Sequence, residues 1–187
     1  MRIDKKHIGN ILFVVFIVVL LFTPLGFQIK VHVNRLISFS PSVVEKPNQK
    51  RVADYNWDLH SSENTNFNLN TAKGKVVFIN MWATWCPSCV AEMPSIQKLY
   101  SSFGSEVIFL CIAQDDHDKV EAYMKKNKFT FPVYYQKSKS PKELESDRIP
   151  TTFILDKEGN IVVEKTGAAD WNSTTTIDLL HSLYNNR

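Results

Sequence analysis

The chain has 187 residues, of which 44% are hydrophobic and 22% are charged, a composition that suits one globular domain with an appendage. Residues 1–50 carry seven Lys and Arg against two acids, whereas residues 51–187 carry fifteen against seventeen. The basic excess therefore lies at the N-terminus, and the remainder is close to neutral. Nucleic-acid binding needs a clustered basic face, so we expect no nucleic-acid partner.

An uncharged stretch at residues 8–29 follows a short basic head. As a helix it would be about 33 Å long, enough to cross a hydrocarbon core of roughly 30 Å. A cleaved signal peptide is the alternative, but the residues after Leu21 contain no small-x-small cleavage site. We therefore expect a single transmembrane helix, with residues 1–29 as cytoplasmic head and anchor, 30–52 as linker and 53–187 as a folded domain.

The positive charges around this stretch bear on its orientation. Lys5 and Lys6 favour a cytoplasmic N-terminus by the positive-inside rule, while Lys30 and Arg35 beyond the stretch weaken that preference. A first hydrophobic segment with a very short head usually inserts in this direction. We expect a single-pass membrane protein with residues 30–187 outside the cytoplasm, as a periplasmic domain.

The segment that follows, residues 30–52, contains Ser, Pro, Asn and Lys without a clear hydrophobic period. It is expected to form a tether that lets the domain stand off the bilayer. An ordered strand near residues 30–38 is the alternative. Short candidate strands at 55–59 and 67–69, with an Asn/Ser-rich turn between them, would form a hairpin extension at the start of the domain.

The rest of the domain alternates strand and helix patterns. Two continuous apolar runs, 76–82 and 106–113, have the length of strands that are buried on both faces. Residues 151–167 are typical of an antiparallel hairpin around Gly159, which supplies the positive φ of the turn. Helical patterns occupy residues 87–102, 115–127 and 171–184, with an extended segment at 131–136 and a short helix at 140–146. This order predicts an α/β fold with a central mixed sheet and helices on both faces.

The two cysteines of the sequence WCPSC, residues 85–89, lie where the first buried strand runs into a helix. Cys86 would occupy the helix start, where unpaired N–H groups and the helix dipole stabilise a thiolate. Cys89 would lie one turn further on, turned inward and placed to attack a mixed disulfide on Cys86. A zinc site would need two further ligands, and neither Cys111 nor the five His residues provide a paired spacing. A copper site with a His or Met, and a structural disulfide, remain open at this point.

Three features occur together in this domain: VVFINMWATWCPSC at residues 76–89, Pro94 in the following helix, and RIPTTFILDKEGNIV at residues 148–162. Together they resemble the thioredoxin superfamily, and more closely its membrane-anchored TlpA/ResA-like branch of extracytoplasmic thiol–disulfide oxidoreductases. The resemblance covers about residues 52–187. It implies a thioredoxin-like fold, thiol–disulfide oxidoreductase activity and no cofactor or metal beyond a redox-active disulfide between the two cysteines.

The resemblance also implies roles for the residues around the pair. Cys86 would be the attacking thiol and Cys89 the resolving thiol, with Pro87 and Ser88 between them influencing the redox potential. Glu92 resembles a family glutamate near the buried thiol that can tune the pKa of that thiol or carry its proton. The alternative is a solvated acid that is merely favoured by the dipole of the first helical turn.

Pro150 would be a cis-proline facing the disulfide, an ordinary trans-proline being the alternative. Ile149 would pair with an extended substrate segment, and Thr151 is a further candidate substrate-binding residue. Trp85 would pack beside the sulfur atoms and shape the docking surface, unless it is a simple core residue. Asn80 stands where thioredoxins proper have Asp, which moves any proton-accepting role to the glutamate.

The function expected from this resemblance is that of a reductant. A membrane-tethered domain would reduce disulfides in exported proteins, for example the cysteines of apocytochrome c before haem attachment. Its partners would be exported proteins with disulfides or thiols and a membrane electron donor of the thiol–disulfide type, and we expect a monomer. The alternatives are a disulfide-forming oxidant on the same fold and a copper-binding or chaperone module. Because thioredoxin lies near −270 mV and the oxidant DsbA near −120 mV, a redox titration separates reductant from oxidant.

Overall fold

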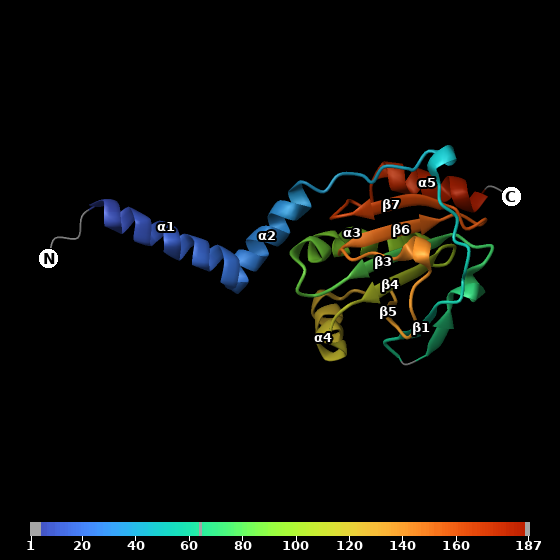
Figure 1. Ribbon diagram of the computed structural model, residues 1–187, viewed down its shortest axis with the longest axis horizontal. Helices are drawn as coiled ribbons and strands as arrows, with labels where there is room; N and C mark the ends of the chain where they lie inside the picture. Colours follow the sequence, from blue (N-terminus) through green and yellow to red (C-terminus); the bar gives the residue numbers. More distant parts are fainter. Residues whose placement is uncertain (1–4, 64, 186–187) are drawn as a thin grey trace.

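The computed structural model describes residues 5–63 and 65–185 of the chain. A seven-stranded sheet in the order β2-β1-β5-β4-β3-β6-β7 forms the centre of the domain, and a bent pair of helices leads away from it (Figure 1). The strands are β1 (Asp58–Ser61), β2 (Asn66–Asn68), β3 (Val77–Trp82), β4 (Ile108–Ala113), β5 (Val133–Gln136), β6 (Thr151–Leu155) and β7 (Ile161–Thr166). The α-helices are α1 (Lys5–Phe22), α2 (Pro24–Leu36), α3 (Pro87–Phe103), α4 (His117–Asn127) and α5 (Thr174–Asn185), and the 3₁₀ helices are η1 (Lys46–Asn48), η2 (Leu69–Ala72) and η3 (Lys142–Leu144).

The pairing of the strands confirms the predicted mixed sheet. The central strand β3 pairs in parallel with β4 and antiparallel with β6. β6 and β7 form the predicted hairpin, in which Gly159 has a φ of +85°. β1 and β2 form the predicted hairpin extension, which joins the sheet through antiparallel pairing of β1 with β5. The segment predicted as merely extended, residues 131–136, contains β5, which pairs in parallel with β4.

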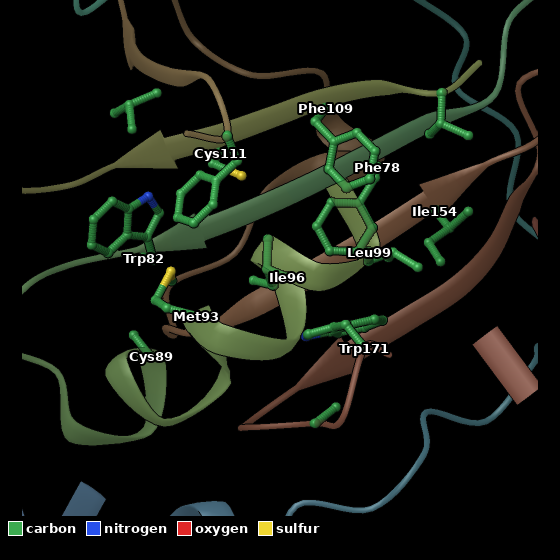
Figure 2. Close-up of a cluster of buried hydrophobic side chains, with 14 of the residues drawn as sticks. Phe78, Trp82, Cys89, Met93, Ile96, Leu99, Phe109, Cys111, Ile154 and Trp171 are labelled. Atoms are coloured by element: carbon green, nitrogen blue, oxygen red, sulfur yellow. The ribbon is translucent and has the colours of Figure 1, made fainter. Parts of the chain in front are cut away.

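Alternate residues of β3 point to opposite sides of the sheet and belong to two separate cores. Phe78 and Trp82 point to the side covered by α3, α4 and α5, where they share a core with Met93 and Ile96 of α3 (Figure 2). Trp171 packs edge-on against Phe78, with the ring centroids 5.2 Å apart. This core fixes α3 against the sheet and so fixes the position at which the helix begins.

Val77, Ile79 and Met81 point to the other side, which is covered by η2, by η3 and by the segment before β1. Among the described residues, the helical cover of this face consists of 3₁₀ helices, so helices flank the sheet on both sides, as predicted. The short helix predicted at residues 140–146 is the 3₁₀ turn η3, which begins directly after Pro141.

The N-terminal apolar stretch is two helices, which corrects the single helix expected over residues 8–29. Thr23 caps α2 by accepting a hydrogen bond from the N–H of Gly26 at 3.3 Å, and Pro24 takes the first position of α2. Proline is favourable at the start of a helix but breaks one that precedes it. Within the described residues, no single helix is long and apolar enough to cross a membrane. Gly9–Phe22 and Pro24–Leu36, bent by 74°, meet the required length and composition only as a pair.

The predicted linker is ordered over much of its length. Its first residues belong to α2, and residues 37–52, which we call the edge segment, lie along the outermost strand β7. The N–H of Val44 donates to the carbonyl of Val162, and the N–H of Ile161 donates to the carbonyl of Lys50, both at 2.8 Å. The structure differs from the expected tether because the open edge of β7 offers backbone hydrogen-bond partners to this segment.

Candidate active site

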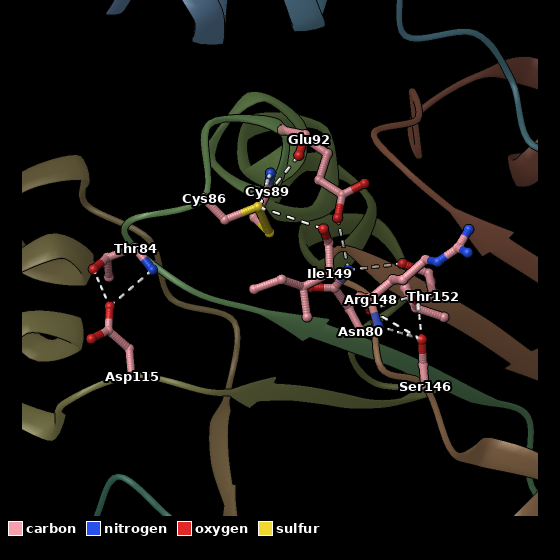
Figure 3. Close-up of a disulfide and its surroundings, with 12 residues drawn as sticks. Asn80, Thr84, Cys86, Cys89, Glu92, Asp115, Ser146, Arg148, Ile149 and Thr152 are labelled. Carbon is pink, nitrogen blue, oxygen red and sulfur yellow. Dashed lines mark hydrogen bonds between the residues drawn. A yellow bond between two sulfur atoms is a disulfide. The ribbon is translucent and has the colours of Figure 1, made fainter. Parts of the chain in front are cut away.

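The cysteine pair lies where the chain leaves β3 and enters α3 (Figure 3). Cys86 directly precedes the helix in an extended conformation, and Pro87 begins the helix. Cys86 and Cys89 form a disulfide with their Cα atoms 5.2 Å apart. The N–H of Cys89 donates to Cys86 Sγ at 3.2 Å, and it is one of the first-turn donors that have no partner within the helix. The same geometry would stabilise a thiolate on Cys86 after reduction.

The residues around the pair differ in their access to a docking protein. Cys86 is 4% exposed and Cys89 is fully buried, in the same core as Met93. Trp85 is 61% exposed, so it is not a core residue and its ring is available to a partner. The hydroxyl of Ser88 lies 3.3 Å from Cys86 Sγ. An incoming sulfur atom would therefore reach Cys86 first, which is the order expected for an attacking and a resolving cysteine.

The loop before β6 forms the second wall of the site. The peptide bond between Ile149 and Pro150 is cis, as the resemblance implied. The carbonyl oxygen of Ile149 lies 3.8 Å from Cys86 Sγ, which brings the two predicted motifs together. The side chain of Thr151 is buried and donates from its hydroxyl to the carbonyl of Arg148 at 2.9 Å. A substrate-binding role of Thr151 would therefore fall to its backbone.

A hydrogen-bonded pair that the sequence did not reveal holds the loop before the cysteines. The N–H and the hydroxyl of Thr84 both donate to one carboxylate oxygen of Asp115, the N–H at 3.1 Å. Asp115 directly follows the residue after β4, so the contact ties the β3–α3 loop to the end of the neighbouring strand (Figure 3). Burial acts to raise the pKa of Asp115, but the hydrogen bonds from Thr84 and from the backbone of Asp116 outweigh it and lower that pKa.

Glu92 is buried on α3, one turn after Cys89, with 1% of its surface exposed. Asn80 Nδ2 donates to Glu92 Oε1 at 2.8 Å. The N–H of Ala169 and the indole Nε1 of Trp171 both donate to Glu92 Oε2, at 3.2 Å and 2.8 Å. This burial excludes the alternative that Glu92 is a solvated acid of the first helical turn.

Burial raises the pKa of Glu92 to about 7, because the carboxylate loses its hydration. The hydrogen bonds from Trp171, Asn80 and Ala169 and the positive charge of Lys165 act in the opposite direction. The carboxyl group therefore gains or loses its proton near neutral pH. Such a group can accept a proton from a neighbouring thiol and return it.

Asn80 connects this carboxyl to the sheet. Its amide nitrogen also donates to Thr152 Oγ1 at 2.8 Å, and no described residue donates to its buried Oδ1. Asn80 cannot take up a proton, which leaves Glu92, one helical turn after Cys89, as the buried acid among the described residues. Cys111 pairs with Asn80 across the sheet and is fully buried. Burial, with the nearby charge of Glu92, raises the pKa of Cys111, so this third cysteine stays a thiol.

Two further observations concern a possible metal site and the long-range contacts of Glu92. Within the part of the chain that the structure describes, no group of three or more His, Cys, Asp or Glu side chains could hold a metal ion. The contacts of Glu92 with Ala169 and Trp171 span more than seventy residues, and no local pattern signals them.

The comparisons with known proteins agree with this geometry. A family model described as redoxin matches residues 39–179. The thioredoxin-like protein YneN of Bacillus subtilis is 30% identical over 132 residues, which cover 68% of this chain and 76% of YneN. The thiol-disulfide oxidoreductase ResA of the same organism is 29% identical over 133 residues, covering 70% of this chain and 71% of ResA.

A solved structure is similar as well. The crystal structure of StoA from Bacillus subtilis matches with a TM-score of 0.52 and 27% sequence identity, over 66% of this chain and 92% of StoA. The similarity to ResA is the one that the motifs predicted. Thiol–disulfide oxidoreductase, the enzyme class predicted from the sequence, is the one that ResA carries in its name.

Proposed function

Because the chain belongs to the redoxin family, as a ResA-like member of the thioredoxin superfamily, we propose that it is a membrane-tethered thiol–disulfide oxidoreductase. It acts outside the cytoplasm and reduces disulfides of exported proteins. The observation that carries this proposal is the disulfide at the start of α3. Cys86 is the outer and Cys89 the buried member of the pair, and the buried carboxyl of Glu92 lies one turn further on.

The reaction begins with the reduced pair. The Cys86 thiolate attacks one sulfur of the substrate disulfide, so that a mixed disulfide forms, the substrate S–S bond breaks and the other substrate sulfur leaves as a thiolate. Cys89 then gives its proton to the Glu92 carboxylate and attacks Cys86 Sγ. The second substrate sulfur leaves as a thiolate, and the Cys86–Cys89 disulfide remains. Two electrons have passed to the substrate, whose thiolates take up protons from water.

The substrate would dock along the wall formed by the cis-proline loop. Ile149 and Pro150 lie on one side of Cys86 and the exposed ring of Trp85 precedes it in the chain. An extended segment beside Ile149 could pair with its backbone. In the branch that the sequence resembles, the substrate is often apocytochrome c before haem attachment, and we propose the same class of substrate here.

The location rests on the N-terminal helices. The basic head favours a cytoplasmic N-terminus, and the apolar helix pair has the composition of a membrane anchor. A thiol–disulfide electron donor in the membrane would then reduce the Cys86–Cys89 disulfide after each cycle. No cofactor beyond this disulfide is needed for the two-electron exchange.

Trapping of the mixed disulfide tests the proposal. Cys89→Ser should accumulate an adduct between Cys86 and the substrate, because the resolving thiol is missing. Non-reducing electrophoresis and mass spectrometry of the full chain from membranes would reveal the adduct and its partner. Cys86→Ser should form none, and Cys111→Ser is the matched control that should behave as the wild type. Adducts on Cys111, or equal trapping by both active-site variants, would contradict the assignment.

One contact favours the opposite direction of electron flow as a second candidate. The N–H of Cys89 on Cys86 Sγ stabilises a thiolate and hence the reduced pair, as in a disulfide-forming oxidant. Equilibration of the protein with glutathione buffers would measure the potential. A value above roughly −150 mV, close to that of DsbA, would replace the reductant by the oxidant.

A further inference from the structure

The helix α2 exposes a continuous apolar stripe. Leu25, Ile29, Val33 and Leu36 are 41–82% exposed. Residues spaced by three or four positions share one side of a helix, so these four side chains form a single row. Ile37 and Phe39, directly after the helix, are exposed as well.

The opposite side of α2 is attached to the active-site helix. Val31 is 2% exposed and forms a small core with Val90 and Ala91 of α3, to which Phe27 adds. The Nε of Arg35 donates to the carbonyl of Ala91 at 3.4 Å. Val90 directly follows Cys89 in the chain, so this attachment lies at the first turns of the helix that carries the disulfide. α2 cannot enter the hydrocarbon core of a membrane without leaving α3.

The charged residues beside the apolar stripe indicate which kind of surface α2 would bind. Lys30 and Arg35 lie within α2, and the sequence contains no acidic residue from position 9 to position 44. An apolar row with basic neighbours is the pattern of a helix that lies in the interface of an anionic bilayer. Each cation near such a surface adds to the attraction.

The preceding helix, α1, is the part of the chain that would bring α2 to a bilayer. Side chains at every position from Ile11 to Phe16 of α1 are at least half exposed, and a helix that is apolar all round is typical of a membrane span. The uncharged part of α1, residues 8–22, is about 22 Å long and so enters a hydrocarbon core of roughly 30 Å without matching its full thickness. If α1 follows the bilayer normal, the 74° bend directs α2 almost along the membrane surface.

We propose that α2 lies in the lipid interface and holds the cysteine end of the domain against the membrane. α1 is then the part of the chain that enters the bilayer, and the proposal rests on the membrane anchoring put forward under the proposed function. Figure 1 shows α2 beside the end of the sheet toward which the arrows of β3 and β4 point, and β3 leads from there into Cys86. The disulfide would thus exchange with thiols of proteins that lie at the membrane surface.

Energy transfer from tryptophan to lipid tests this placement. All four Trp residues of the full chain lie beyond position 56, so they report on the distance of the folded domain from the bilayer. The chain would be placed in vesicles of phosphatidylcholine and phosphatidylglycerol with a dansyl-labelled headgroup lipid. We expect strong transfer for the wild type and loss of most of it for Val33→Glu. The matched control, Val43→Glu, changes a residue of similar exposure, 45% against 51%, outside α2 and should keep the wild-type transfer.

The outcomes separate this inference from the proposed function. Wild-type transfer in Val33→Glu, or an equal loss in both variants, would overturn the placement of α2. Resistance of the protein to alkaline carbonate extraction reports on the anchor, and a chain that is extracted would overturn the anchoring and with it this inference. Unchanged insulin reduction by Val33→Glu in detergent would show that the variant is folded. Vesicles of phosphatidylcholine only should give weaker transfer, and equal transfer would overturn the role of the cations.

Discussion

The buried carboxyl of Glu92 is the residue of the site whose state depends most on pH. Its pKa of about 7 reflects burial, which three N–H donors offset in part. The fold therefore favours the protonated form relative to the unfolded chain, in which the pKa returns to its ordinary value of 4.5. The stability contributed by protonation is fully present below pH 4.5 and is lost as the pH rises through about 7.

Glu92→Gln should remove this pH dependence. The difference between the two pKa values corresponds to about 3 kcal/mol, so the wild type should lose stability of that order between acidic and mildly alkaline pH. The variant should keep a nearly constant free energy of unfolding, because its amide does not titrate. Rotation of the Asn80 amide would turn its Oδ1, to which no described residue donates, toward the new NH₂ group. Urea unfolding at pH 5 and pH 8 measures the effect.

Glu92→Leu is the control that separates charge from hydrogen bonding. It leaves the donors of Asn80, Ala169 and Trp171 buried without their acceptor, and each lost partner costs about 1–3 kcal/mol. We expect this variant to be less stable than the wild type at both pH values. A Gln variant that declines with pH as the wild type does would show that Glu92 does not titrate near neutrality.

At the residue scale, local patterns are enough to place residues along a helix. The positions of Cys86 before the helix and of Glu92 one turn after Cys89 follow from spacing. The partners of Glu92 on the far side of the fold do not, because Trp171 lies 79 residues away in the chain. Only the tertiary structure brings that indole to the carboxyl.

At the scale of elements, the loop between β3 and α3 depends on its attachment to β4. Asp115→Ala should remove the acceptor of both Thr84 donors and loosen the loop that carries Cys86. We expect a loss of about 1–2 kcal/mol in stability and slower formation of mixed disulfides with a small aromatic disulfide, monitored by absorbance after reduction of the pair.

The neighbouring acid supplies a matched control. Asp116 caps α4 by accepting from the N–H groups of Asp118 and Lys119, and loss of a cap costs a similar ~1 kcal/mol. Asp116→Ala should therefore lose stability without slowing the cysteine chemistry. Equal slowing in both variants would mean that general destabilisation, and not the Thr84 contact, governs the reactivity.

Helices and strands with a clear hydrophobic pattern could be predicted from the sequence. Residues 76–82 and 106–113 are apolar throughout, and β3 and β4 form there. The break between α1 and α2 was missed because hydropathy continues across it, although Thr23 before Pro24 is a capping signal. The short helix predicted at residues 140–146 is a single 3₁₀ turn.

At the scale of the whole molecule, the edge segment closes one side of the sheet. β7 is the last strand in the order, and an open edge is a site for pairing with another chain. Hydrogen bonds between the segment and Val162, Ile161 and Gly159 occupy that edge. The composition of residues 30–52 gave no sign of this, since the partners lie more than a hundred residues further along the chain.

Truncation at two points tests whether the edge segment belongs to the domain. A chain of residues 37–187 keeps the segment and should fold, whereas residues 53–187, the domain boundary predicted from sequence, lack it. The shorter chain loses the buried side chain of Val52 and the hydrogen bonds on β7, and we expect it to be less stable by about 2–3 kcal/mol.

Urea unfolding and light scattering would compare the two chains. The exposed edge of β7 should also make the shorter chain associate at higher concentration, because its free N–H and carbonyl groups can pair with a second copy. Equal stability and equal scattering would mean that the segment contributes nothing to the fold and acts as the tether expected from its composition. A difference would place the start of the folded unit near residue 37, directly after the helix that we assign to the membrane surface.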